Sequence, residues 1–306
     1  MALSKLNNDI CSIITNFVIE PTYILLDWID INNLDFNYLS RNPNAIEILK
    51  NNSDKINWEE LSRNPNAIEI LKKNPDKIDW YYLSRNPNAI EILKNNPDKI
   101  NWEELSNNKN AVELLRNNPD KIDWSYLSQN PNAIELLKDN PDKIDWKFLS
   151  RNPNAIEILK NNPDKIVWCY LAQNKNIEAI DLIKNHFENI VHCPNYHYYI
   201  FWYSLSINPN AIEIIKNNLD KIMWHILSSN ENNEAIQLLQ ENIINIDWTV
   251  ISQNRNPNAI ELLRNNQDKI DWKILSLNPS IFKLNIYDNT TEKYKKMYNT
   301  ISSIFT

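Results

Sequence analysis

The chain has 306 residues, of which 42% are hydrophobic, and a formal net charge of -7 at pH 7. Glycine is absent. This excludes glycine-rich phosphate loops, dinucleotide fingerprints and nucleophile elbows in their usual form, because each uses glycine for a positive φ or a close backbone approach. The acidic balance argues against nucleic-acid binding, which needs clustered Lys and Arg facing phosphates. We therefore expect no nucleotide cofactor and no nucleic-acid partner.

The cysteines and the N-terminal residues indicate the compartment. Cys11, Cys169 and Cys193 are odd in number and scattered, which argues against a disulfide framework. The first residues lack an uninterrupted apolar region, and no stretch of the chain reaches the length of a membrane span. The prediction is a soluble intracellular protein with no membrane contact.

The first predicted element is an amphipathic helix over residues 1–19. It would cap the open end of the array that follows. Its apolar residues recur at helical spacing: Leu3, Leu6, Ile10, Ile13, Ile14 and Phe17.

Residues 20–190 form the first part of a repeat array, with a period of 22 residues. The leading leucine of each unit returns at the same interval as a tryptophan, and Phe36 takes the tryptophan place in the first, degenerate unit. The leucines are Leu39, Leu61, Leu83, Leu105, Leu127, Leu149 and Leu171; the tryptophans are Trp58, Trp80, Trp102, Trp124, Trp146 and Trp168. A fixed period of this length is typical of stacked repeats.

Each unit predicts two short helices. In the third unit, Asn86 precedes Pro87, which suits an N-cap followed by proline at the first helical position. An apolar stripe follows and ends at Asn95–Asn96, where asparagine would take the left-handed conformation in place of glycine. The second helix starts after Asn101, and Asn57 with Glu60 has the sequence of a capping box.

The repeat is interrupted by a predicted loop at residues 191–201 and resumes over residues 202–279. The resumed part keeps the tryptophans Trp202, Trp224, Trp248 and Trp272. Residues 280–306 predict a second capping helix, since Tyr294, Met297 and Tyr298 lie at helical spacing.

These elements predict an all-α fold, an α-solenoid of about eleven helix–short-helix units with helical caps. Helices this short do not form alone, so stacking must stabilise them. With layers about 8–10 Å apart, the array would be a rod or superhelix on the order of 100 Å long. Whether the second helix is 3₁₀ stays open, as does superhelix handedness. A leucine-rich horseshoe is the alternative fold. Its strand motif, L-x-x-L-x-L-x-x-N-x-L, needs leucine where this repeat has Asn88, and Pro87 directly follows the asparagine.

The unit L-S-x-N-P-N-A-I-E-x-L-x-x-N-x-D-K-I-x-W resembles the short-repeat proteins that giant DNA viruses of amoebae and algae encode in many copies. The resemblance covers residues about 20–280. The helix–short-helix scheme is also similar to leucine-rich variant repeats. The resemblance implies a viral interaction module, located in the host cytoplasm or the virion, and it carries over no catalytic residue.

The tryptophan column is interpreted as a core ladder, with one large side chain per layer; an exposed aromatic ladder for a ligand is the alternative. The residue after each tryptophan is the most variable in the unit, and we expect these first post-Trp residues to be exposed and to form one binding column. The alternative is sequence drift at unconstrained surface sites. The candidates are Glu59, Tyr81, Glu103, Ser125, Lys147, Cys169, Tyr203 and His225.

The predicted loop at 191–201 is rich in aromatic residues and gives further partner-binding candidates: Tyr196, Tyr198, Tyr199 and Phe201. Histidines and a cysteine gather beside it, and such a cluster could hold zinc, although its spacing matches no standard site. The weak metal candidates are His186, His192, Cys193 and His197.

No unique constellation of catalytic residues stands out, because carboxylates recur at fixed repeat positions, so an enzyme is not expected. The leading hypothesis is a scaffold that binds protein partners. The alternatives are a virion or assembly component that self-associates, and a ligase adaptor, since residues 3–18 faintly resemble an F-box opening.

Overall fold

The computed structural model describes residues 22–191 and 195–285, without the side chains of residues 189, 191 and 195–197. The described residues fall into two compact units, residues 22–29 with 281–285 and residues 30–280, and we call the latter the repeat body. The predicted caps at residues 1–19 and 286–306 lie outside the described residues.

The small unit is a two-stranded antiparallel sheet of β1 (Tyr23–Leu25) and β2 (Phe282–Leu284), with Ile24 opposite Lys283. Backbone hydrogen bonds from Leu26 N to Ile281 O and from Asn285 N to Thr22 O, both 2.9 Å, extend the pairing. The prediction of a helix from residue 280 onward was therefore wrong for residues 282–284, because their backbone groups pair with an extended segment far away in sequence.

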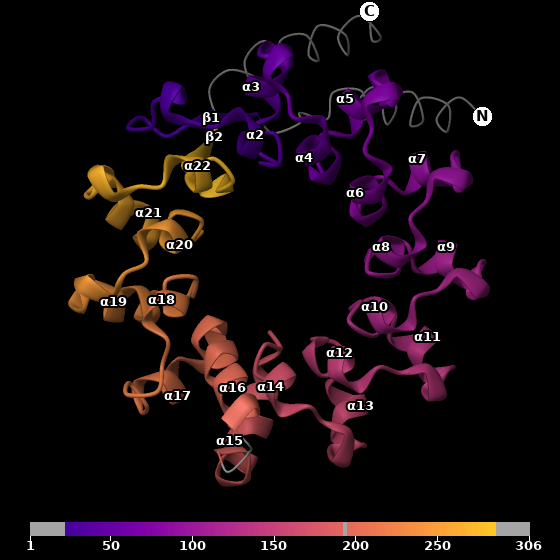
Figure 1. The fold of residues 1–306 in the computed structure, drawn as a ribbon, viewed down its shortest axis with the longest axis vertical. Coiled ribbons are helices and arrows are strands. Elements are labelled where there is room, and N and C mark those ends of the chain that lie inside the picture. The colour runs from indigo at the N-terminus through magenta and orange to yellow at the C-terminus, as the bar shows by residue number, and fades with distance from the viewer. Residues whose placement is uncertain (1–21, 192–194, 286–306) are drawn as a thin grey trace, which may run out of the picture. The chain divides into compact units, whose positions relative to one another are not determined.

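The repeat body alternates an inner helix, an outer helix and a 3₁₀ turn, and Figure 1 shows the inner helices on the inside of a ring and the outer helices outside it. The inner helices are α2 (Phe36–Leu39), α4 (Trp58–Arg63), α6 (Trp80–Arg85), α8 (Trp102–Ser106), α10 (Trp124–Ser128), α12 (Trp146–Arg151), α14 (Trp168–Leu171), α16 (Asn195–Ile207), α18 (Trp224–Leu227), α20 (Trp248–Ser252) and α22 (Trp272–Leu275). The outer helices are α3 (Ile46–Asn51), α5 (Ile68–Lys73), α7 (Ile90–Lys94), α9 (Val112–Arg116), α11 (Ile134–Lys138), α13 (Ile156–Lys160), α15 (Ile177–Val191), α17 (Ile212–Lys216), α19 (Asn233–Glu241) and α21 (Pro257–Arg264). This confirms the all-α repeat fold and excludes the horseshoe.

In most units a 3₁₀ turn lies between the outer helix and the next inner helix, as at η4 (Pro97–Lys99), whereas η8 (Pro209–Ala211) lies between α16 and α17. The second helix of the unit, which could have been 3₁₀ from its sequence, is α-helical, as at α8. Proline starts most of these turns because its fixed φ suits the first position and it has no N–H to satisfy.

The core is a column of small and medium aliphatic side chains. In the third unit Leu83, Ala89 and Leu93 have no exposed surface, and Ile100 closes the layer at 8% exposure. Full burial of one leucine contributes about 1.5–3 kcal/mol. Repeated in every unit, this burial stabilises helices that are individually too short to form.

An asparagine ladder joins neighbouring units and explains the N-P-N motif. The Asn86 side-chain amide donates to Ser62 O and Asn64 O, both at 3.0 Å, while its Oδ1 accepts from Asn88 N at 3.0 Å. Asn88 Nδ2 in turn donates to Pro65 O at 2.8 Å. Among the described residues, the asparagines that make the paired donation are Asn42, Asn64, Asn86, Asn108, Asn130, Asn152, Asn174, Asn208, Asn230, Asn254 and Asn278.

A serine makes the second inter-unit bond. Ser84 Oγ donates to Trp80 O at 2.8 Å inside its own helix and accepts from Asn101 N of the next unit at 2.9 Å. Ala172 stands in the serine place in the unit before the interruption. There the next inner helix, α16, is continuous through residue 201, so its N–H groups bond within the helix and need no serine.

The first and last units of the repeat body are joined by the same bonds. Asn42 Nδ2 donates to Ser276 O at 2.9 Å and to Asn278 O at 3.0 Å, and Asp35 N donates to Ser276 Oγ at 2.9 Å. Asn44 Nδ2 donates to Pro279 O at 3.0 Å. The repeat body is thus a closed ring (Figure 1), not the open rod or superhelix that the period alone predicted.

Three predicted helix-end features were wrong or partly wrong. Asn86 forms an Asx turn with Asn88, and the outer helix begins later, with Ala89 at its N-cap. Asn95 is right-handed (φ -81°), and no described residue has a positive φ. Asn57 accepts from Glu60 N at 3.1 Å as predicted, but its own N–H donates to Ser40 Oγ, which displaces the second half of the capping box.

The tryptophan column lies at the edge of the core. Trp202 is buried, whereas the other repeat tryptophans are half-buried. A lysine from the next 3₁₀ turn covers the ring: Lys77 Nζ lies 4.6 Å from the Trp58 centroid, and Lys269 Nζ lies 4.8 Å from that of Trp248. Such cation–π contacts contribute about 0.5–1 kcal/mol at exposed sites.

Candidate binding surface

The first post-Trp residues lie in the first turn of the inner helices, except Tyr203, which lies inside the longer α16. Glu59, Tyr81, Glu103, Lys147, Tyr203 and His225 are exposed, as expected. Ser125 is half-buried and donates to Asp145 Oδ2 at 3.0 Å. Cys169 is 4% exposed and is not available to a partner, because the lengthened helix α16 packs against α14.

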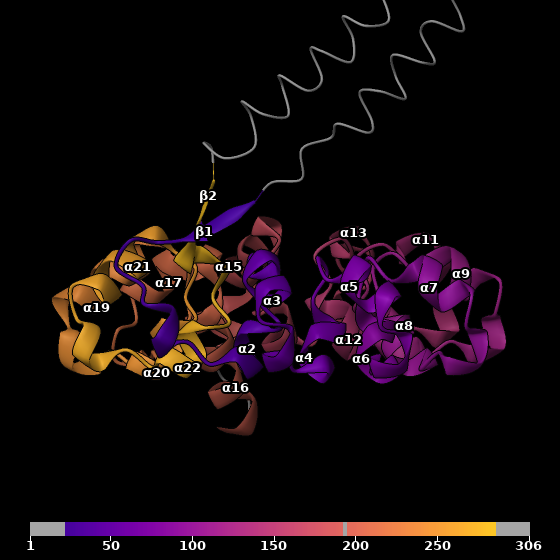
Figure 2. The same ribbon diagram turned by 90° about the horizontal axis from the view of Figure 1, so that it is seen from above.

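The predicted loop at 191–201 is mostly helical. The interruption lengthens the outer helix α15 and the inner helix α16, and residues 192–194 between them lie outside the described residues. Figure 2 shows these two helices extending past the edge of the repeat body.

The aromatic candidates on α16 separate by exposure. Tyr199 is 61% exposed and Tyr198 half-buried, whereas Phe201 is 2% exposed and packs beside Trp202, with ring centroids 5.9 Å apart. Phe201 is therefore a core residue, contrary to the prediction. The Tyr196 side chain lies outside the described residues.

The histidine cluster is only partly described. His186 Nδ1 lies 2.9 Å from Leu182 O, and its ring lies 4.9 Å from that of Trp168, so both contacts are structural. His192 and Cys193, and the side chain of His197, lie outside the described residues. Within the described part of the chain, no group of three or more His, Cys, Asp or Glu side chains is arranged to hold a metal ion.

A second column was not predicted from the sequence. It consists of the residue directly after the Leu-Ser pair at the C-terminal end of each inner helix. The residue at this position contacts the second post-Trp residue of the next unit. Arg63 Cζ lies 3.4 Å from the Tyr82 ring centroid, and Arg151 Cζ lies 5.5 Å from that of Tyr170. Where the next unit offers a carboxylate, the contact is an ion pair, as from Arg85 Nη1 to Glu104 Oε2 at 3.7 Å.

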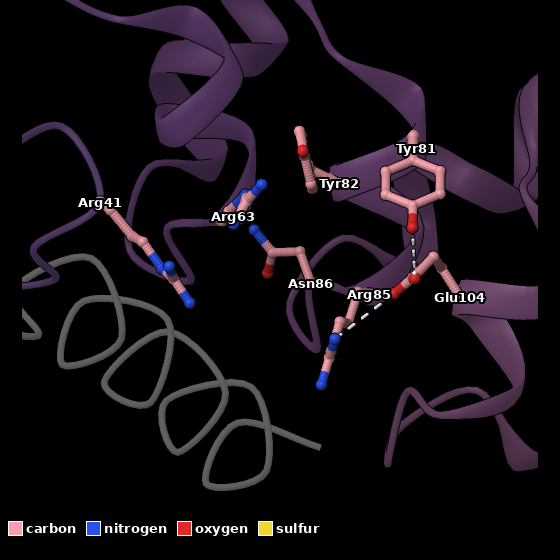
Figure 3. A pocket seen from close by; sticks show the side chains of 7 residues that line it. All are labelled: Arg41, Arg63, Tyr81, Tyr82, Arg85, Asn86 and Glu104. Carbon is pink, nitrogen blue, oxygen red and sulfur yellow. Dashed lines mark hydrogen bonds and ion pairs between the residues drawn. The ribbon is translucent and has the colours of Figure 1, made fainter. Parts of the chain in front are cut away.

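Three consecutive arginines of this column converge on a hollow of about 320 Å³, which we call the arginine hollow (Figure 3). Its lining is Arg41, Arg63, Tyr81, Tyr82, Arg85, Asn86 and Glu104. Its residues lie on or next to the inner helices α4, α6 and α8, except Arg41, which follows the C-cap residue of α2. Tyr81 and Tyr82 meet edge to face, with ring centroids 5.0 Å apart.

The carboxylates beside the hollow are held by tyrosines. Tyr81 Oη donates to Glu104 Oε1 at 2.8 Å, and this bond to the carboxylate raises the pKa of Tyr81 above its usual value near 10. The Glu103 carboxylate raises the pKa of Tyr126 in the same way. Glu104 itself is 5% exposed. Each tyrosine hydroxyl therefore holds a glutamate carboxylate in place by donating a hydrogen bond to it. This hydrogen bond competes with those that the nearby guanidinium groups could donate to the same carboxylate.

The arginines had a signal in the sequence: Arg41, Arg63 and Arg85 are spaced by one repeat. The variability of the residue directly after tryptophan predicts the neighbouring column as the binding surface instead. Of the predicted binding residues, only Tyr81 lines the hollow.

The inner helices across the ring carry a different surface. The second post-Trp residues there are Ile226, Val250 and Ile274, all half-buried. The residues at the arginine position are Ser229, Gln253 and Leu277. We call α18, α20 and α22, with the residues that follow them, the aliphatic arc. We call α2, α4, α6 and α8, with the residues that follow them, the charged arc.

Comparison of the chain with protein-family models, with curated proteins and with solved structures gives no match. In the described part of the chain, no helix is both long and apolar enough to cross a membrane. The geometry of the inner surface is therefore the basis for a function.

Proposed function

We propose that this protein is a non-enzymatic scaffold that binds protein partners through the inner helices of the repeat body. The observation that carries the proposal is a contrast within each unit. The leucine, serine and asparagine of the framework are buried in almost every repeat, and the serine and asparagine form hydrogen bonds with the neighbouring units, as Ser84 and Asn86 do. The first post-Trp residues are mostly exposed and differ from unit to unit.

Exposure and diversity on one continuous face are the properties with which repeat proteins recognise partners. Repetition of the framework leaves no need for a particular side chain after tryptophan, so the variety of Glu59, Tyr81, Lys147 and His225 is free to match a partner. The sequence resemblance to viral short-repeat proteins supports an interaction role in the host cytoplasm or the virion.

The test is capture of partners by the tagged full chain from a host lysate, with two matched triple variants. Tyr203→Ala, His225→Ala and Thr249→Ala alter exposed inner residues, and Asn217→Ala, Gln237→Ala and Asn265→Ala alter exposed outer residues. The proposal expects the inner variant to lose a partner that the outer variant retains, with unchanged thermal unfolding in both. Equal capture of every partner by the outer variant, the inner variant and a second inner variant, Glu59→Ala, Tyr81→Ala and Lys147→Ala, would refute it.

A further inference from the structure

We propose that the arginine hollow binds an acidic peptide segment in polyproline II conformation, one carboxylate for each arginine. This inference rests on the proposed function and specifies the chemistry of the partner at one place on the inner surface.

The three guanidinium groups have donors to spare. Arg41 Nε lies 4.0 Å from Glu60 Oε2, and Arg85 lies 3.7 Å from Glu104. These are ion-pair distances, longer than the 2.7–2.9 Å of a charge-assisted hydrogen bond. No hydrogen bond joins these guanidinium groups to another residue in the described part of the chain, and Arg63 Nε is buried without an acceptor.

Arg63 is the least exposed of the three. Its side chain is 26% exposed, its guanidinium lies on the face of Tyr82, and its ion pairs with Glu59 and Glu60 are 3.7 and 3.8 Å long. A planar guanidinium held on a ring presents its N–H groups in a fixed plane, which favours bidentate recognition of a carboxylate. Arg41 and Arg85, with side chains 50% and 61% exposed, lie on either side and are open to a ligand.

The neighbouring glutamates set the strength of binding. Three glutamates, Glu59, Glu60 and Glu104, balance the charge of the three arginines. The hollow therefore attracts an acidic peptide only weakly at long range. Glu104 is tied to the Tyr81 hydroxyl, and Glu60 Oε2 is buried without a hydrogen bond. A carboxylate of the bound peptide can therefore make short hydrogen bonds to the arginines that Glu60 and Glu104 do not make. It competes with these two glutamates for the guanidinium groups.

The repeat sets the spacing of the ligand. Packed helix layers are about 8–10 Å apart. A peptide in the polyproline II conformation advances about 3.1 Å per residue with three residues per turn, so every third side chain lies on the same face. Arginines on consecutive units therefore match acidic residues at every third position of a polyproline II segment.

A peptide fits the hollow better than a nucleic acid does. Nucleic-acid binding needs positive side chains along the whole track of the backbone. Here the run of three arginines is broken by Asn107 and Gln129 before Arg151, and the chain carries a net charge of -7. Tyr81, 47% exposed, adds an aromatic surface for a peptide side chain.

The experiment uses the full chain and a fluorescein-labelled ten-residue peptide with glutamate at every third position and serine and alanine elsewhere, followed by fluorescence anisotropy at low salt. Arg63→Gln should weaken binding by about tenfold or more, as expected for loss of hydrogen bonds to a charged group. Arg116→Gln is the matched control: it removes the same charge from the outer helix α9, where Arg116 pairs with Glu113 at 3.7 Å, and binding should be unchanged.

Two further variants guard against a folding effect. Arg63→Lys keeps the charge and loses the planar fork, so it should also weaken binding. Glu60→Gln removes a competing carboxylate and should strengthen binding by about two- to threefold, a gain that misfolding does not produce. A peptide with the same glutamates in one contiguous block should bind more weakly.

Equal affinity of Arg63→Gln and Arg116→Gln would overturn the inference, as would a loss of affinity in Glu60→Gln. Tighter arginine-dependent binding of a single-stranded oligonucleotide of equal charge would overturn the class of partner. If the hollow fails but Tyr203→Ala, His225→Ala and Thr249→Ala still abolish capture, the scaffold proposal stands and only the inference about the hollow falls.

Discussion

The charged arc and the aliphatic arc share one framework and present different surfaces. In both, an asparagine amide spans two carbonyl groups of the preceding unit, as with Asn86 and Asn230. At the second post-Trp position, the Tyr82 ring lies beneath the Arg63 guanidinium in one arc, whereas the half-buried aliphatic Ile226 occupies this position in the other. Stacking therefore fixes the buried positions and leaves the inner surface to vary.

The largest expected effect tests whether the framework is the same in both arcs. Asn86→Ala and Asn230→Ala should each lower the free energy of unfolding by about 2–4 kcal/mol, because one carbonyl group and one N–H lose their partner, while the second carbonyl keeps a backbone donor. Urea unfolding of the two variants measures this. The exposed Asn95→Ala should change stability by about 0.5 kcal/mol or less. Unequal losses in the two arcs would show that the framework differs between them.

A reciprocal exchange tests whether the inner surfaces differ. Tyr82→Ile should lower stability by about 1–2 kcal/mol, because Arg63 loses the ring beneath its guanidinium. Ile226→Tyr places a tyrosine where the preceding unit has Ile207 in place of arginine, so no such pair forms. A double-mutant cycle of Tyr82→Ile with Arg63→Gln should give a coupling of about 1 kcal/mol by thermal unfolding. A coupling near zero would contradict the stacking between Arg63 and Tyr82.

The lysine–tryptophan contacts give a smaller effect that should be equal in the two arcs. Lys77→Ala uncovers Trp58 and Lys269→Ala uncovers Trp248, and each should lower stability by about 0.5–1 kcal/mol. Tryptophan fluorescence during urea unfolding measures both. Substitution by methionine, which keeps the covering chain without its charge, separates the cation–π contact from simple coverage of the ring.

The smallest effect is a titration confined to the charged arc. The Glu104 carboxylate raises the pKa of Tyr81, so the neutral phenol is favoured in the folded state. That contribution to stability is complete below the unfolded value near 10 and is lost as pH rises through the folded pKa. The absorbance difference at 295 nm between the unaltered chain and Tyr81→Phe isolates this titration. Glu104→Gln should lower the pKa of Tyr81, and an unchanged midpoint would contradict the assigned cause.

The period, the helical pairs and the buried leucines could be predicted from the sequence, because each depends on local spacing. The role of asparagine could not. Asn86 before Pro87 has the pattern of an N-cap, and only the neighbouring unit supplies the carbonyl groups that its amide bonds. The interruption at 191–201 breaks the period and so predicts a loop, although residues 191 and 195–201 belong to the two lengthened helices α15 and α16.

The candidate site was predicted in part. Exposure after tryptophan follows from helix geometry, and it held for Tyr81 and Lys147. The burial of Cys169 depends on α16, and the convergence of Arg41 and Arg63 depends on the packing of consecutive units, so neither follows from one unit taken alone.

Closure of the repeat body has a consequence for how its length can change. An open array grows or shrinks by whole units, since a duplicated unit only moves the end. In a ring whose first unit bonds to its last through Asn42 and Ser276, a full turn is divided among eleven units, about 33° each. Gain or loss of one unit by recombination would force every remaining interface to rotate or the ring to open. The copy number is therefore under structural selection even though the units themselves are nearly interchangeable.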